Sequence, residues 1–90
     1  MEKLVLLERD LIFLGLLDKA REIYRDLGPN GALSYIKSSH RLLSKVYHPD
    51  LNPGNEQKAQ DLQQRLNHIG ELIGSITDDA LIALLKKGLP

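Results

Sequence analysis

Apolar side chains recur every three or four residues along most of this 90-residue chain. That spacing places them on one face of an α-helix, whereas a half-buried strand would need strict alternation. The pattern occurs in four segments, and the sequence shows neither strand alternation nor an internal repeat. The sequence therefore predicts an all-α fold, and its length fits a single small domain over residues 1–90.

The first segment is leucine-rich and leaves one question open. Its stripe comprises Leu4, Leu7, Leu11, Leu14, Ala20, Ile23, Tyr24 and Leu27. Gly15 either divides this stripe into two helices or weakens a single one. Gly28 and Pro29 are expected to end it, because glycine suits the C′ position of a helix and proline cannot continue one.

Two main helices follow, at about 32–47 and about 56–75, and we expect them to form an antiparallel hairpin. Pro49 ends the first helix, and the turn-forming sequence LNPGN joins the two. The second helix starts after Asn55 as its N-cap, or earlier at Asn52 and Pro53. The expected inward faces are Leu33, Ile36, Ser39 or His40, Leu43 and Tyr47 in the first helix, and Ala59, Leu62, Leu66, Ile69, Leu72 and Ile73 in the second.

A short C-terminal helix is predicted over 77–88. Thr77 opens it, Asp78 and Asp79 stand in its first turn, and Lys86, Lys87 and Gly88 close it. Acid at the start and base at the end of a helix suit its dipole.

The positive charge of the chain is concentrated on one helix. Twelve basic side chains balance twelve acidic ones overall, but no acidic residue occurs from Leu27 to Pro49. Lys37, Arg41 and Lys45 stand four residues apart and therefore line one side of their helix. This row is either an ordinary solvated face or a docking strip for an acidic protein surface.

Composition excludes several classes of function. Without cysteine the chain can form neither disulfides nor a cysteine-based zinc site. Neutral net charge argues against nucleic-acid binding, and the N-terminal leucines are interrupted by charges well short of the about 20 apolar residues of a membrane span. We expect a monomeric cytoplasmic protein that does not bind nucleic acid and has no membrane span.

His48, Pro49 and Asp50 form a polar corner at the end of the basic helix. Proline fixes the backbone there, so an imidazole and a carboxylate are held as a rigid hydrogen-bonding unit. The sequence places no serine or cysteine nucleophile beside them, and the spacing of His40, His48 and His68 with Asp50 matches no standard metal site. We therefore expect a binding device, with no cofactor, metal or enzymatic activity of its own.

The string IKSSHRLLSKVYHPDLNPGN resembles helix two and the following loop of the J-domain, the DnaJ family of co-chaperones. Upstream, EIYRDLG is similar to the family's first helix, with Tyr24 and Leu27 as its packing residues. The resemblance covers roughly residues 23–73 and implies a J-domain-like core over 23–75, preceded by an N-terminal helical extension over 1–22. It implies a DnaK-type seventy-kilodalton heat-shock chaperone as partner, whose ATP hydrolysis the chain stimulates. Its implied partner-binding residues are His48, Pro49, Asp50, Lys37, Arg41 and Lys45.

This sequence departs from the family's pattern at several positions. His40 replaces a common tyrosine, Leu42 replaces a common basic residue, and the loop at 28–32 is shorter than usual. Gly70 and Gly74 weaken a helix by about 1 kcal/mol each, so we expect close packing against a neighbour there. A J-like adaptor with little or no ATPase stimulation therefore remains the alternative function.

Overall fold

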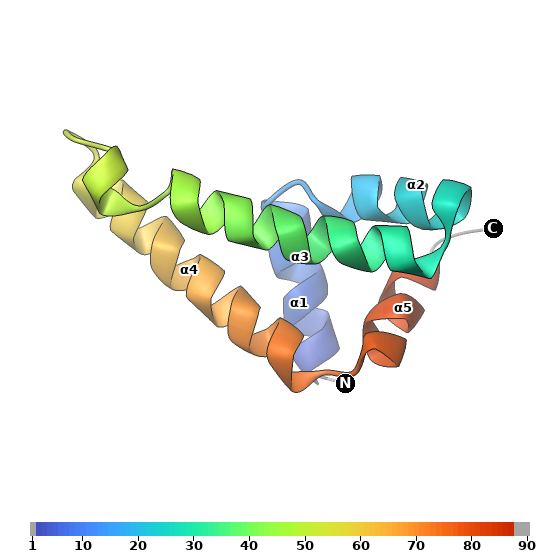
Figure 1. The fold of residues 1–90 in the computed structure, drawn as a ribbon. Coiled ribbons are helices and arrows are strands. Elements are labelled where there is room, and N and C mark those ends of the chain that lie inside the picture. The colour runs from blue at the N-terminus through green and yellow to red at the C-terminus, as the bar shows by residue number, and fades with distance from the viewer. Residues whose placement is uncertain (1, 88–90) are drawn as a thin grey trace.

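Helices make up most of the computed structural model, which describes residues 2–87 (Figure 1). Within these residues no strand occurs, so the all-α prediction is confirmed. None of the helices in this range is both long enough and apolar enough to cross a bilayer. The elements in chain order are α1 (Glu2–Phe13), α2 (Leu17–Leu27), α3 (Pro29–Val46), the 3₁₀ helix η1 (Pro49–Leu51), α4 (Glu56–Ser75) and α5 (Asp78–Lys86).

The two longest helices, α3 and α4, run antiparallel, as predicted for the hairpin (Figure 1). They approach each other at the end that carries η1 and diverge toward the other end, where α1, α2 and α5 pack against them. The described part of the molecule is elongated, with dimensions of 44 × 26 × 18 Å. The polar corner thus lies at the narrow tip of the hairpin, away from the three other helices.

Gly15 divides the first segment into two helices. Its φ is +74°, a left-handed conformation that glycine adopts without steric cost, and the chain changes direction between α1 and α2 (Figure 1). The expected boundary between the N-terminal extension (1–22) and the J-domain-like core (23–75) falls inside α2. Leu7 and Leu11 of α1 are completely buried. The N-terminal helix is therefore part of the core.

The helix predicted at about 32–47 begins earlier, at Pro29, and ends at Val46. Gly28 ends α2 with φ +92°, and its amide donates to the Tyr24 carbonyl at 2.9 Å. Pro29 then occupies the first turn of α3, where its missing N–H costs nothing. The expected loop at 28–32 is thus reduced to one residue. Leu27, expected to pack, is 78% exposed, so that expectation was wrong.

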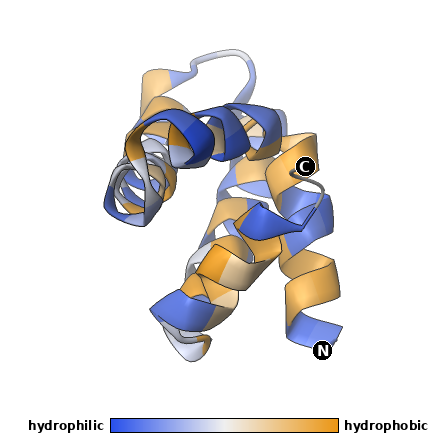
Figure 2. Cartoon of the chain, turned by 90° about the vertical axis from the view of Figure 1, so that its right-hand side faces the viewer, coloured by the Kyte–Doolittle hydropathy of each residue, from blue (hydrophilic) through white to orange (hydrophobic). Residues whose placement is uncertain are grey.

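The core lies where the five α-helices meet, at the wide end of the hairpin. Apolar and polar residues alternate around the helices, as expected when each buries one face (Figure 2). The predicted inward faces are confirmed at the buried residues Leu33, Ile36, Ala59, Leu66, Ile69 and Leu72. The other apolar residues predicted to face inward, Leu43, Tyr47, Leu62 and Ile73, are only partly buried. The main buried cluster comprises Leu7, Leu11, Leu16, Leu17, Ala20, Ala32, Leu33, Ile36, Ile69, Leu72, Leu81, Leu84 and Leu85.

The last helix starts as the sequence predicts. Thr77 is its N-cap, and its hydroxyl accepts the Ala80 amide at 3.1 Å. Asp78 and Asp79 occupy the first turn and Lys86 the last. Gly88, expected at its end, lies outside the described residues.

Candidate partner-binding site

The His48-Pro49-Asp50 corner is exposed at the tip of the hairpin. His48 has extended backbone angles, and its Nδ1 accepts the Asp50 amide at 3.2 Å. The neutral imidazole therefore carries its proton on Nε2. The His48 side chain is 53% exposed and that of Asp50 88% exposed. Both can reach a partner molecule, one as a hydrogen-bond donor and the other as a carboxylate acceptor.

Asn52 holds this corner against the end of α3. Its side-chain amide donates to the main-chain oxygens of Val46 at 2.9 Å and His48 at 2.7 Å. Helix ends leave carbonyl groups without intrahelical partners, and Asn52 satisfies that of Val46 at the end of α3. The His48 oxygen also accepts the Leu51 amide at 3.0 Å, so it has two donors. From the sequence, Asn52 is expected only to form the turn or to stand at the start of the next helix. The asparagine within LNPGN was the available signal, but its target carbonyls cannot be read from sequence.

The start of α4 secures the other side of the loop. α4 begins at Glu56 with Asn55 at the N-cap position, so the earlier start at Asn52 and Pro53 is wrong. Asn55 makes no side-chain capping bond, and the Glu56 carboxylate instead accepts the Gly54 amide at 3.0 Å. This hydrogen bond, followed by one from the Glu56 amide itself, lowers the pKa of the Glu56 carboxyl below 4.5. Side-chain hydrogen bonds therefore hold the loop on both sides, through Asn52 toward α3 and through Glu56 toward α4.

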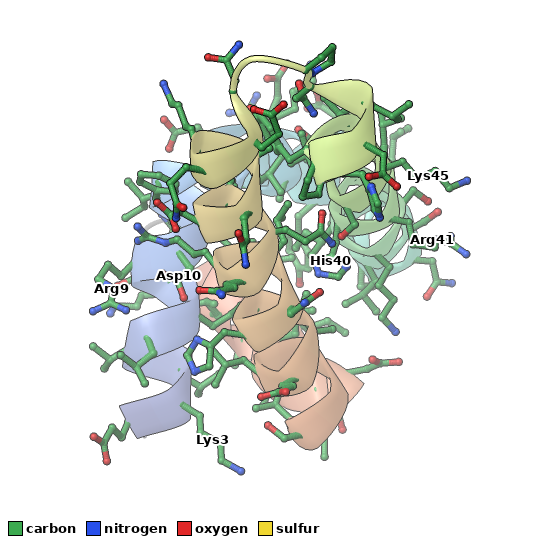
Figure 3. The ribbon with its side chains drawn as sticks, turned by 90° about the vertical axis from the view of Figure 1, so that its left-hand side faces the viewer. Lys3, Arg9, Asp10, His40, Arg41 and Lys45 are labelled. Atoms are coloured by element: carbon green, nitrogen blue, oxygen red, sulfur yellow. The ribbon has the colours of Figure 1, made fainter. Side chains whose placement is uncertain are left out.

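The three basic residues of α3 are all exposed, but they differ in whether their charge is paired with a carboxylate. Arg41 and Lys45 project from α3 into solvent (Figure 3). Lys37 is also exposed, but its Nζ lies 3.1 Å from a carboxylate oxygen of Asp78 in α5. Because α3 ends at Val46, His48 does not continue the row by helical geometry. The corner is therefore flanked chiefly by Arg41 and Lys45, with Lys37 partly neutralised at the far end.

His40 connects the two hairpin helices. Figure 3 shows its ring between α3 and α4, and Nε2 lies 2.6 Å from the Leu66 carbonyl oxygen, to which it donates. A Cβ on Gly70 would stand 2.9 Å from the His40 ring, so the close packing expected there is confirmed. Nothing lies within 4 Å of a Cβ built on Gly74, and that expectation was wrong. Over residues 2–87, no three His, Asp or Glu side chains gather so that they could hold a metal ion.

A buried ionic contact that the sequence analysis missed joins α1 to α4. Asp10 is 1% exposed, and its Oδ1 lies 3.0 Å from Arg65 Nη2. Its Oδ2 has no hydrogen-bond partner among the described residues, and His68 Nδ1 lies 3.9 Å away. The Arg65 guanidinium also stacks on the Phe13 ring, 3.7 Å from its centroid. The position of Asp10 on the apolar stripe of its helix was the one available signal.

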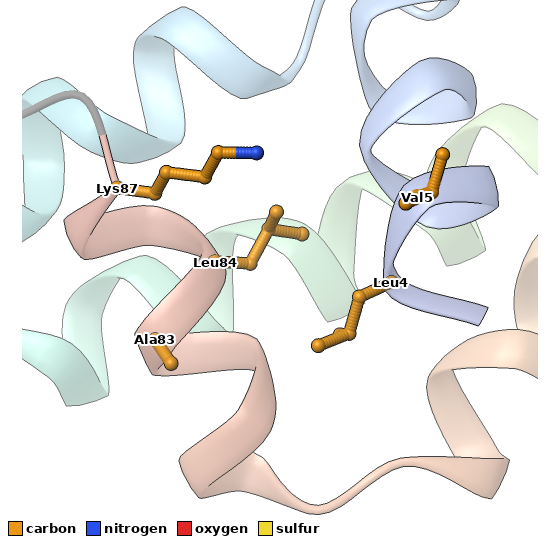
Figure 4. A pocket seen from close by; sticks show the side chains of 5 residues that line it. All are labelled: Leu4, Val5, Ala83, Leu84 and Lys87. Atoms are coloured by element: carbon orange, nitrogen blue, oxygen red, sulfur yellow. The ribbon is translucent and has the colours of Figure 1, made fainter. Parts of the chain in front are cut away.

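An apolar groove of about 290 Å³ lies between α1 and α5 (Figure 4). The lining residues are Leu4, Val5, Ala83, Leu84 and Lys87. Its lysine is the only charged group among them, so the groove offers few of the convergent polar groups that orient a small ligand.

Comparison with known proteins adds no family assignment. No family model, no curated protein and no solved structure matches this chain. Function is therefore argued from the corner, the residues that hold it and the charges beside it.

Proposed function

We propose that this chain is a J-domain-type co-chaperone that docks on a DnaK-type seventy-kilodalton heat-shock chaperone and stimulates its ATP hydrolysis. The observation that carries the proposal is the exposed corner of His48, Pro49 and Asp50 at the hairpin tip. A polar unit outside the core and held by its own local hydrogen bonds is suited to recognition. The groups that hydrolyse ATP belong to the chaperone, so this chain is a binding partner and not an enzyme.

The order of elements supports the same proposal. The segment that resembles the family's first helix falls in α2, the basic helix is α3, and the LNPGN loop leads into α4. These elements follow one another as the resemblance implies, while α1 is an addition. The cysteine-free composition suits a reducing compartment, and we place this activity in the cytoplasm.

The chemistry of the corner suits a partner with a donor-rich surface. A carboxylate such as that of Asp50 can accept two parallel hydrogen bonds from one arginine. The proline and the Asp50 amide bond to His48 reduce the number of conformations lost on binding, which lowers the entropic cost. Arg41 and Lys45 add long-range attraction that mainly raises the association rate and orients the encounter.

A J-like adaptor with little or no stimulation is the second candidate, and one observation favours it. On α1, a helix outside the family's pattern, Val5 is 64%, Ile12 61% and Phe13 52% exposed. Of these, Val5 lines the groove of Figure 4, and exposed apolar residues on α1 would let the chain bind another protein without involving the corner.

Single-turnover ATP hydrolysis by a purified DnaK-type chaperone tests the proposal. We expect the wild-type chain to accelerate hydrolysis and His48→Gln, which removes the imidazole from an exposed position, to lose most of this effect. The melting temperature of His48→Gln should stay close to that of the wild type, since surface substitutions usually change stability by less than about 0.5 kcal/mol. Chaperone binding without acceleration would favour the adaptor function, and equal acceleration by both proteins would reject the role of the corner.

A further inference from the structure

We propose that the groove between α1 and α5 binds an anionic amphiphile, a molecule with a straight aliphatic chain and a carboxylate at one end, such as a free fatty acid. The aliphatic chain lies between the two helices, and the carboxylate binds the Lys87 ammonium group. The groove is at the wide end of the hairpin, away from the polar corner at its tip. This binding site is therefore independent of the proposed function.

The lining of the groove selects an aliphatic ligand. Leu4 and Val5 line it on the α1 side, and the space has a volume of about 290 Å³, close to the lower end of the range for small-molecule pockets (Figure 4). Ala83 and Leu84 line it on the α5 side. None of the described lining residues is aromatic, so a flat ring would find no ring to stack on. A straight hydrocarbon chain can instead cover these side chains and remove their apolar surface from water.

The charged end of the ligand is selected by Lys87. Figure 4 shows its side chain extending from the end of α5 toward α1, near Leu84. It is the only charged residue among the described ones that line the groove, and its side chain is 69% exposed. One cation beside an otherwise apolar surface suits a ligand with a single negative charge at one end. A ligand with several polar groups would leave most of them without a hydrogen-bond partner here.

Lys87 can turn to the ligand without leaving an unpaired carboxylate behind. Its Nζ lies 3.6 Å from Glu8 Oε2, and Arg21 Nη2 lies 3.5 Å from the same oxygen atom. Two cations thus share one carboxylate, so this group of three carries one uncompensated positive charge. Arg21 Nη2 also donates to the Leu84 main-chain oxygen at 3.3 Å, which holds the arginine in place. When Lys87 moves onto a ligand carboxylate, Glu8 therefore keeps Arg21 as its partner.

The size of the groove favours a small molecule as its occupant. Five described residues line it, whereas a standard protein interface uses about 20–30 residues on each side. The groove alone is therefore too small to be a protein interface. We assign it to a free molecule, and the test below separates this occupant from a bilayer surface.

Titration of the isotope-labelled 90-residue chain with sodium octanoate, below its micelle concentration, tests the site by NMR. We expect saturable binding at one site, with the largest shifts at the amides of Val5, Ala83 and Leu84. Octyltrimethylammonium has the same aliphatic chain and the opposite charge, and should bind at least about threefold more weakly. Lys87→Gln should lower the affinity for octanoate about threefold and leave that for uncharged 1-octanol unchanged.

Two substitutions on α1 form a matched pair, because Val5 is 64% and Ile12 61% exposed. Val5→Asp places a carboxylate at the groove and should lower octanoate affinity about tenfold, through lost apolar contact and charge repulsion. Ile12→Asp places the same charge two turns away and should bind as the wild type does. Both positions are exposed, so the two melting temperatures should stay close to that of the wild type. Ala83→Leu, also at an exposed position, fills the groove and should abolish binding.

Several results would overturn this site. Titration without saturation, or equal affinity for octanoate and octyltrimethylammonium, would do so. The same holds for an equal loss in Val5→Asp and Ile12→Asp, and for wild-type affinity of Lys87→Gln or Ala83→Leu. Co-sedimentation with vesicles of phosphatidylcholine and phosphatidylglycerol, without binding of octanoate, would assign the groove to a bilayer surface and reject the free ligand. His48→Gln should bind octanoate as the wild type does, so this site is decided separately from chaperone stimulation.

Discussion

The side-chain amide of Asn52 donates to the main-chain oxygen of His48 at 2.7 Å, and so ties the polar corner to a residue four positions further on. The same nitrogen donates to the Val46 oxygen at 2.9 Å, which fixes the corner relative to the end of α3. One amide therefore sets the direction in which the chain leaves the basic helix.

Asn52→Asp should impair chaperone stimulation far more than it impairs folding. Aspartate has nearly the same shape but offers no N–H, and its charge faces two carbonyl oxygens. Because the Asn52 side-chain bonds are exposed, water can replace them, so we expect a stability loss of about 1 kcal/mol or less. Stimulation and urea unfolding are measured on the same variant. Asn55→Asp is the control and should stimulate as the wild type does, because the Asn55 side chain makes no capping bond. If Asn52→Asp stimulated hydrolysis as strongly as the wild type, the prediction would be contradicted.

Gly70→Ala and Gly74→Ala should change stability in opposite directions. Each exchange favours a helix by up to about 1 kcal/mol. At Gly70 the added methyl would press on the His40 ring and disturb its bond to Leu66, and we expect a net loss of about 1–2 kcal/mol. At Gly74 the space is open, so the gain should remain. Thermal unfolding compares the two variants, and equal stabilisation by both would show that the His40 packing is unimportant.

Arg41→Glu should weaken docking while leaving the melting temperature almost unchanged. Arg41 is exposed and has no acidic partner among residues 2–87, so its reversal should cost the fold less than about 0.5 kcal/mol. Docking should become weaker and less sensitive to salt. Lys37→Glu is the matched comparison, because it would place two carboxylates together at Asp78 and should lower the melting temperature more. A large stability loss in Arg41→Glu would mean that this arginine is structural.

Acid should loosen the loop between α3 and α4 through Glu56. The hydrogen bond from the Gly54 amide lowers the pKa of Glu56 in the folded protein below 4.5, its value in the unfolded chain. The ionised carboxylate therefore supports the loop above pH 4.5, and this support is lost as the pH falls through the lower folded pKa. The Gly54 amide should lose protection from hydrogen exchange as the pH falls through the folded pKa of Glu56, when each observed rate is compared with the intrinsic rate at the same pH. In Glu56→Gln the protection of the Gly54 amide should not depend on pH in this way. If the same pH dependence remained in that variant, another titrating group would be its cause.

Much of the helical fold could be predicted from apolar spacing and from its interruptions. Pro49, Thr77 and the stripe from Ala59 to Leu72 are local signals, and local signals locate helices well. Pro29 misled the prediction because a proline after a glycine can end one helix, begin the next, or do both. Gly15 could not be decided, since its left-handed φ of +74° is a property of the folded backbone.

The candidate site could be predicted only where its residues are adjacent in sequence. His48, Pro49 and Asp50 are consecutive, and Arg41 and Lys45 follow from helical spacing. The bonds of Asn52 depend on where the helix before it ends. Asp10 and Arg65 are 55 residues apart, so their contact requires the tertiary fold. The pairing of Lys37 with Asp78 depends in the same way on how α5 packs beside α3.

The separation of the leucine-rich core from the hairpin tip has a practical consequence. Randomised libraries at positions 48–55 should yield mostly foldable members, because these positions contribute none of the buried cluster. Partner preference in such a scaffold can then be evolved in the laboratory without a compensating search for stabilising substitutions elsewhere.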